Sequence, residues 1–178
     1  MEPDLYNSVE GIYDPVANPS GWLVYDKPLS DVLNTIVIHH SVSSPGYGPL
    51  EIQARHMFVK GYADIGYHFV IDELGQMYFG RSLTVRGAHT GGYNTGTVGI
   101  LLLGNFEETL PSVEQLASLK KLSRCLVSNY GITYIAGHTD FQPDITVCPG
   151  KFLEAMLPKL ASELKLKYGI AGYRGPDP

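Results

Sequence analysis

The 178-residue sequence lacks several features that would indicate particular classes of protein. It has 13 Lys and Arg against 18 Asp and Glu, a net charge of −5. It therefore has none of the basic excess that nucleic-acid-binding proteins carry. Its longest strongly apolar run, residues 99–104, is far too short to span a bilayer. These absences disfavour nucleic acid as a partner and predict no membrane span.

Signals of secretion are also missing. No apolar segment precedes the first basic residue, Lys27, and no Asn-x-Ser/Thr glycosylation site occurs. We therefore expect synthesis in a cytoplasm without a signal peptide. The two cysteines, Cys125 and Cys148, could form one disulfide. Without signs of secretion, we favour two free thiols.

The order of apolar segments predicts an α/β fold. Strand-like runs are found at residues 35–40, 66–72, 76–80, 97–103 and 132–136, and helical patterns at 50–60, 112–131 and 151–167. This alternation, in a chain long enough for one core, predicts a single domain with a central mixed β-sheet flanked by helices. We expect that domain at residues 35–168. Residues 1–34, rich in turn-forming residues, are predicted to be an irregular arm packed on it, and 169–178 a C-terminal tail.

The segment that follows Ser112 gives the clearest helix signal. Ser112 and Gln115 have the spacing of a capping box, and Gly131 marks the expected end. Apolar residues recur at helical spacing between these limits. Cys125 falls within this stripe, where a free cysteine acts as a small hydrophobic side chain.

Three residues far apart in the sequence have the side chains of a zinc site. His39 follows the apolar run 35–38, and His138 and Cys148 follow the predicted strand 132–136. Two imidazoles and one thiolate leave one position of a tetrahedral zinc open, as in catalytic sites. Because zinc activates water in such sites, hydrolysis is the first chemistry to consider.

The other histidines are more readily explained as structural residues. His40 follows His39 on a strand and therefore faces the opposite side. His56 falls on a predicted helix without an identifiable partner, and His68 alternates with aromatic residues in a strand-like run.

Four sequence motifs occur together in one order. They are VIHHS at 37–41, DIGYHFVI at 64–71, GAH at 87–89 with GYN at 92–94 and VGI at 98–100, and GHTD at 137–140 with TVCPG at 146–150. This pattern resembles the type-2 N-acetylmuramoyl-L-alanine amidase family, which includes zinc-dependent phage lysin amidases and peptidoglycan recognition proteins. The resemblance covers about residues 35–160 and implies a peptidoglycan-recognition-protein-like fold.

The resemblance implies one Zn²⁺, held by the same three ligands, and a reaction. The zinc-activated water would attack the amide bond between N-acetylmuramic acid and L-alanine in peptidoglycan. Tyr67 would be catalytic through a hydrogen bond to the oxyanion, and Thr146 by orienting the water or the carbonyl. His89 and Asn94 match a loop that borders the substrate groove and are predicted to bind substrate. No motif identifies the group that gives a proton to the leaving amine.

One interval departs from the family pattern. Cys148 follows His138 by ten residues, about two more than in the family's common form. The longer loop could bulge harmlessly, displace Thr146, or let Asp140 or Asp144 compete for the metal.

The resemblance leaves three functions to weigh. The leading one is a bacteriolytic, endolysin-like amidase with antimicrobial action, expected to be a monomer and to reach the cell wall on lysis or by another route of export. The second is a peptidoglycan-binding receptor without activity, but such relatives typically lose a zinc ligand. The third is a cytosolic amidase that recycles anhydro-muropeptides, whose relatives have Asp at the position of Cys148.

Overall fold

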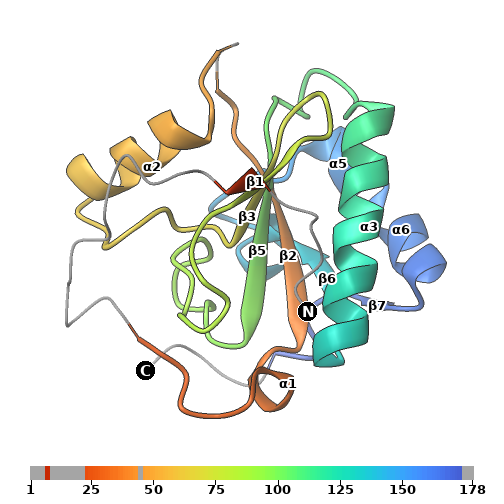
Figure 1. Cartoon of the computed structure of the whole chain (residues 1–178). Helices are drawn as coiled ribbons and strands as arrows, with labels where there is room; N and C mark the ends of the chain where they lie inside the picture. Colours follow the sequence, from red (N-terminus) through yellow and green to blue (C-terminus); the bar gives the residue numbers. More distant parts are fainter. Residues whose placement is uncertain (1–6, 9–22, 44–45, 174–178) are drawn as a thin grey trace.

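A mixed β-sheet forms the centre of the protein in a computed structural model that describes residues 7–8, 23–43 and 46–173 (Figure 1). Within that part of the chain the strand order is β1-β4-β3-β5-β2-β6-β7. The strands are β1 Asn7–Ser8, β2 Thr35–His40, β3 Phe69–Ile71, β4 Met77–Phe79, β5 Thr97–Leu102, β6 Tyr134–Gly137 and β7 Lys167–Tyr168. Only β3 and β4 pair antiparallel among the described strands. The predicted α/β architecture with a central mixed sheet is confirmed.

Helices cover both faces of this sheet (Figure 1). They are α1 Leu29–Val32, α2 Pro49–Phe58, α3 Val113–Tyr130, α4 His138–Phe141, α5 Lys151–Glu154 and α6 Leu157–Leu164. Side chains alternate between the faces of a strand. Ile100 on β5 therefore packs in the large core with α3 and α6, and its neighbour Leu101 packs with Ile52 of α2. His39 shares the α2 side, since its register partner on β5 is Leu101.

The predicted limits of α3 are confirmed by its caps. The Ser112 hydroxyl accepts a hydrogen bond from the Gln115 backbone N–H at 2.9 Å, and the Gln115 side chain accepts one from the Ser112 N–H at 3.1 Å. Gly131 ends the helix with a φ of 67°, a conformation that glycine adopts without steric cost.

Several predicted boundaries are wrong. The last helix is not continuous over 151–167 but divides into α5 and α6, with Pro158, which has no backbone N–H, in the first turn of α6. The strand expected at 66–72 is limited to Phe69–Ile71, and the one expected at 132–136 begins at Tyr134. The predicted irregular arm includes the helical turn α1. Within that arm, residues 1–6 and 9–22 lie outside the described residues, as do 174–178 of the predicted tail.

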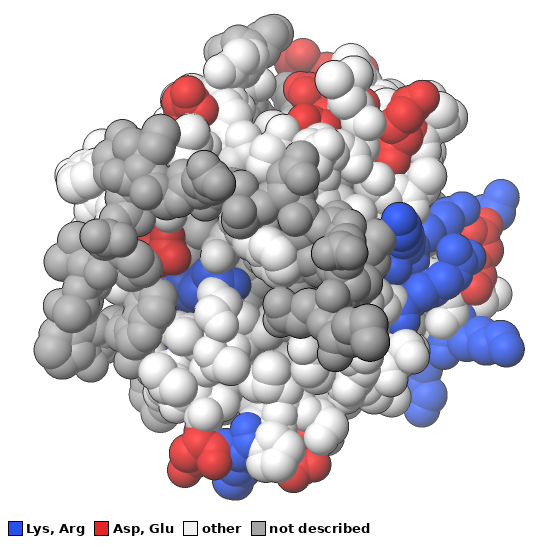
Figure 2. Space-filling model, in the orientation of Figure 1, with Lys and Arg blue, Asp and Glu red and all other residues white. Residues whose placement is uncertain are grey.

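The surface charge is unevenly distributed. Figure 2 shows Lys and Arg side chains gathered on the side where α3 and α6 lie. An ion pair of 2.5 Å between Lys120 and Glu163 joins these helices there. No helix in the described part of the chain has the length and apolar character needed to cross a membrane.

Candidate active site

The parallel pairing of β2 and β6 brings two of the predicted ligands together. Ile38 on β2 is in register with Gly137 on β6, so the next residues, His39 and His138, lie side by side where these strands end. Their ring centroids are 4.7 Å apart. Carboxyl ends of parallel strands share one edge of a sheet, a common place for ligand sites in α/β proteins. The sheet therefore unites residues that are about a hundred positions apart.

The loop after α4 adds the third predicted ligand. The Thr139 backbone N–H donates to the Cys148 carbonyl at 2.7 Å, and the His40 backbone N–H lies 3.4 Å from the Cys148 sulfur. Cys148 is buried, and it is not joined to Cys125 in a disulfide, as favoured from the sequence. Its Sγ lies 3.6 Å from Nδ1 of His39.

The donor atoms of His39, His138 and Cys148 all lie within 4.8 Å of one another. Zinc bonds of about 2.0 Å to nitrogen and about 2.3 Å to sulfur, set at the tetrahedral angle, separate those two atoms by about 3.5 Å. The observed 3.6 Å between His39 Nδ1 and Cys148 Sγ matches this separation. Two imidazoles and a thiol are also donors that suit zinc. The residues present therefore fit a zinc ion.

Burial sets the protonation of these three side chains in the metal-free protein. Burial, followed by the neighbouring histidines, lowers the pKa of His39 well below its usual value. Burial also lowers the pKa of His138, although its hydrogen bond to Gln142 acts in the opposite direction. Burial raises the pKa of the Cys148 thiol to about 12. At neutral pH the histidines are thus neutral donors, and the thiol must lose a proton to bind a metal.

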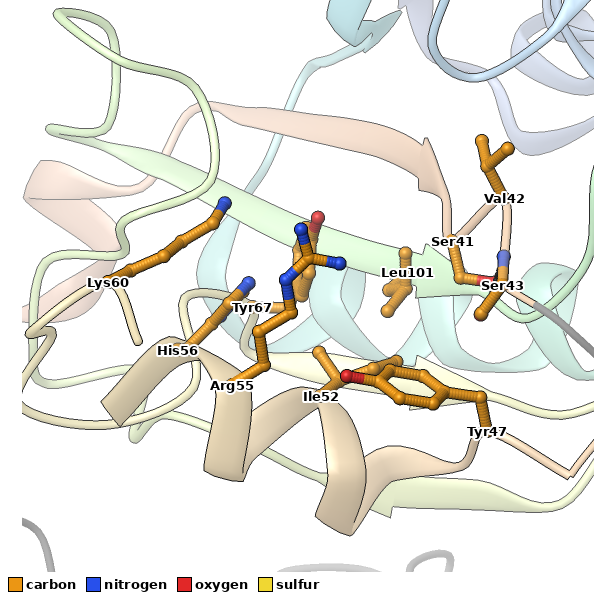
Figure 3. Close-up of a pocket in the computed structure, with 10 residues that line it drawn as sticks. All are labelled: Ser41, Val42, Ser43, Tyr47, Ile52, Arg55, His56, Lys60, Tyr67 and Leu101. Carbon is orange, nitrogen blue, oxygen red and sulfur yellow. Dashed lines mark hydrogen bonds between the residues drawn. The ribbon is translucent and has the colours of Figure 1, made fainter. Parts of the chain in front are cut away.

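Tyr67 connects this cluster to an open cleft. Its ring centroid is 5.1 Å from that of His39, and its side chain lines a cleft of about 380 Å³. Figure 3 shows Arg55 and His56 projecting into the cleft from α2, with Ser41 and Ser43 on another side. Burial raises the pKa of Tyr67, so its hydroxyl stays protonated and can donate a hydrogen bond.

The longer loop does not bring a carboxylate into the ligand cluster. Asp140 is engaged elsewhere, because its carboxylate accepts from the Gly137 N–H at 2.7 Å and from the Tyr168 hydroxyl at 2.9 Å. Asp144 is exposed and does not belong to the candidate metal group found among the described residues. The Thr146 hydroxyl accepts from the Cys148 N–H at 3.1 Å and so lies beside this ligand.

The loop at residues 86–96 places His89 against a predicted ligand. Nδ1 of His89 lies 3.0 Å from Nε2 of His39, and His89 is 8% exposed. Asn94 is also buried, and its Oδ1 accepts from the backbone N–H groups of His89 and Thr90 at 2.8 and 2.9 Å. Both residues were predicted to bind substrate, and that role stays a prediction.

Sequence reasoning missed three residues of this region. Arg55 and Lys60 contribute two cationic side chains to the cleft. Gln142 accepts a hydrogen bond from His138 Nε2 at 2.8 Å through its Oε1. The spacing of four residues between His138 and Gln142 could have revealed this pair, had the short helix α4 been predicted.

The remaining histidines have structural partners. Nδ1 of His56 accepts from the Gly66 N–H at 2.9 Å. Nδ1 of His68 accepts from the Gly99 N–H at 3.0 Å, and its Nε2 lies 3.1 Å from the Val85 carbonyl. Burial lowers the pKa of each ring to about 4. These contacts agree with the structural role predicted for His68 and supply the partner that the sequence did not indicate for His56.

The fold and this donor set are those of a candidate metallohydrolase. A family model described as N-acetylmuramoyl-L-alanine amidase, the type-2 amidase family, matches residues 29–151. The chain belongs to this family.

Similar proteins include both N-acetylmuramoyl-L-alanine amidases and peptidoglycan recognition proteins. A peptidoglycan-recognition protein of Drosophila simulans is 34% identical over 128 residues, which cover 66% of this chain and 69% of that protein. Peptidoglycan-recognition protein SC2 of Drosophila melanogaster is 38% identical over 132 residues, 68% and 71% of the two chains. Among solved structures, the N-acetylmuramoyl-L-alanine amidase LysC from Clostridium intestinale has a TM-score of 0.69 and 36% identity, covering 76% of this chain and 87% of its own. Drosophila peptidoglycan recognition protein SD has a TM-score of 0.65 and 31% identity, with coverages of 71% and 80%.

Proposed function

We propose that this protein is a zinc-dependent hydrolase that cleaves the amide bond between N-acetylmuramic acid and L-alanine in peptidoglycan. The observation that carries the proposal is the complete donor set. His39, His138 and Cys148 converge at one end of the sheet, beside a cleft that Tyr67 lines. Three protein ligands leave a coordination position open, as a catalytic zinc requires and a structural zinc does not.

The residues around the donor set support hydrolysis of an amide. A bound zinc supplies Lewis acidity and a nucleophile at neutral pH. Tyr67, protonated because of its burial, donates a hydrogen bond toward the oxygen that becomes negative as the carbonyl is attacked. Thr146, whose hydroxyl lies beside Cys148, helps to orient the reacting groups.

The charge of the cleft supports an acidic peptide as the part of the substrate bound next to the scissile amide. Arg55 and Lys60 line the cleft together with Tyr47 and Ile52, which offer an aromatic and an aliphatic surface (Figure 3). Guanidinium and ammonium groups bind carboxylates well, and a guanidinium does so with two parallel hydrogen bonds. The stem peptide of peptidoglycan presents such carboxylates. We also propose that the protein acts at the cell wall as an endolysin-like bacteriolytic enzyme, and that it does so as a monomer.

A non-catalytic receptor is the alternative that the relatives favour, because several of the proteins similar to this chain are peptidoglycan recognition proteins. The two functions differ in one measurable product. Hydrolysis frees the amino group of L-alanine, whereas a receptor binds peptidoglycan and leaves it intact.

The deciding experiment incubates the purified protein with peptidoglycan and measures the release of L-alanine amino groups. We expect release by the zinc-loaded protein, loss of release with a chelator, and recovery when zinc is restored. Cys148→Ser should be inactive in the same assay. Tight binding without release would refute the amidase and support the receptor. A parallel arm with soluble anhydro-muropeptides tests the recycling function, which would be supported if these fragments were cleaved and intact wall were not.

A further inference from the structure

We propose that the loop at residues 86–96 orients both histidine ligands of the metal site, through His89 on one side and Gln142 on the other. This inference rests on the proposed function, because it concerns how His39 and His138 present their nitrogens to zinc. It assigns His89 and Gln142 as positioning residues that act through the ligands.

The first contact in this arrangement is between His89 and His39. His39 faces Cys148 with Nδ1, at 3.6 Å, and faces His89 with Nε2, at 3.0 Å. A neutral imidazole that binds zinc through Nδ1 carries its proton on Nε2. Nδ1 of His89 is therefore the acceptor that holds His39 in the zinc-binding tautomer. The Thr90 hydroxyl, 2.9 Å from the same His89 nitrogen and 3.5 Å from His39 Nε2, completes this contact.

The backbone around His89 fixes its ring in this position. A Cβ atom built on Gly99 of β5 would lie 2.5 Å from the His89 ring, and so would one built on Gly87. Only glycines leave room for the ring at these two places. The backbone of Thr97 hydrogen-bonds to His89, and Thr97 lies beside Nε2 of the His89 ring. A proton on Nε2 leaves Nδ1 free to accept from His39.

The second set of contacts links the same loop to His138 through Gln142. The Gln142 amide nitrogen donates to the Gly91 carbonyl at 3.1 Å, which directs its Oε1 toward Nε2 of His138 at 2.8 Å. This acceptor places the proton of His138 on Nε2 and leaves Nδ1 for the metal. Asn94 stabilises the loop, because its side chain accepts hydrogen bonds from the His89 and Thr90 N–H groups. One loop thus determines the tautomers of two ligands, one on β2 and the other at the start of α4.

Paired variants separate the hydrogen bonds from general packing. His89→Leu and Gln142→Leu remove the acceptors. His89→Asn keeps an amide oxygen near the Nδ1 position. Gln142→Glu keeps an oxygen acceptor for His138 but loses the amide donor to Gly91. Asn129→Leu, an amide-to-Leu change on α3, across the sheet from α2, serves as the matched control, since Asn129 bonds to Cys125 of its own helix.

The measurement is zinc affinity at one fixed pH, by competition with a chromogenic chelator, with thermal unfolding of each metal-free variant as a test of folding. Partners of zinc-ligating histidines typically contribute about 10- to 100-fold to metal affinity. We expect a loss of that size in His89→Leu and Gln142→Leu, and near wild-type affinity in His89→Asn and Asn129→Leu. Gln142→Glu should show a smaller loss than Gln142→Leu, because it keeps the acceptor for His138 without the bond to Gly91. Gln142 is half-buried, so its substitution disturbs packing less than that of His89. If His89→Leu fails to fold, the comparison of Gln142→Leu with Gln142→Glu tests the inference.

Three results would overturn the inference. They are unchanged affinity in the folded acceptor-less variants, an equal loss in the acceptor-retaining variants, and an equal loss in Asn129→Leu. If the wild-type protein bound no zinc, the proposed function would fall together with the inference. If the wild type bound zinc and released L-alanine amino groups while the Leu variants bound zinc equally well, only the positioning role would fall.

Discussion

The protonated thiol of Cys148 makes zinc affinity depend on pH in a predictable way. Burial raises the pKa of Cys148 to about 12, so the metal-free protein holds a proton on this sulfur throughout the neutral range. Zinc binds the thiolate, and each binding event must therefore release that proton. His39 and His138 release none at neutral pH, since burial lowers the pKa of both and they are already neutral.

These protonation states fix the size and the sign of the effect. The thiol proton by itself makes the apparent association constant for zinc rise about tenfold for each unit of pH, or about 1.4 kcal/mol, and ionisation of a zinc-bound water would add to this slope. Between pH 7 and pH 9 the affinity should increase by at least about 100-fold, because both values lie below the pKa of Cys148. Below the pKa of the two histidines the dependence becomes steeper, since they must also lose protons.

The assay is zinc titration against a chelator whose own protonation is corrected for, at several pH values from 7 to 9. Calorimetry in buffers of different ionisation enthalpy counts the released protons independently. Cys148→Ser is the control, because a serine hydroxyl stays protonated: its zinc affinity should be much weaker. A wild-type affinity that did not change with pH over this range would refute the assignment of a protonated Cys148 as a ligand.

Two further predictions concern neighbouring residues. Tyr67→Phe removes the hydroxyl while keeping the ring beside His39, so kcat for amide release should fall by about 100-fold or more with unchanged zinc affinity; unchanged turnover would reduce Tyr67 to a packing residue. His68 has a pKa of about 4 in the folded protein because of burial, below the value of about 6.5 expected when unfolded. The unfolded state therefore binds the proton first as pH falls, and the free energy of unfolding should drop by up to about 3 kcal/mol between pH 6.5 and pH 4. Urea unfolding of the metal-free protein should show a smaller drop in His68→Gln, and equal drops in the two proteins would contradict this explanation.

Which features could be predicted from the sequence depends on how far apart along the chain the interacting residues lie. The capping box at Ser112 and the glycine end at Gly131 were predicted correctly, since they depend on residues within one or two helical turns. The division between α5 and α6 was missed, although Pro158 was visible in the sequence. An apolar stripe at helical spacing runs across the break, so periodicity alone did not reveal it.

The sequence by itself determined the identity of the candidate ligands. His39, His138 and Cys148 belong to motifs whose order can be read along the chain, and each follows or lies near a predictable strand. The tertiary structure alone decided how these ligands are oriented. The contacts of His89 with His39, and of Gln142 with both His138 and Gly91, depend on the register of parallel strands and on where a loop passes over them. No local pattern encodes such contacts, because the partners are brought together only when distant strands pair.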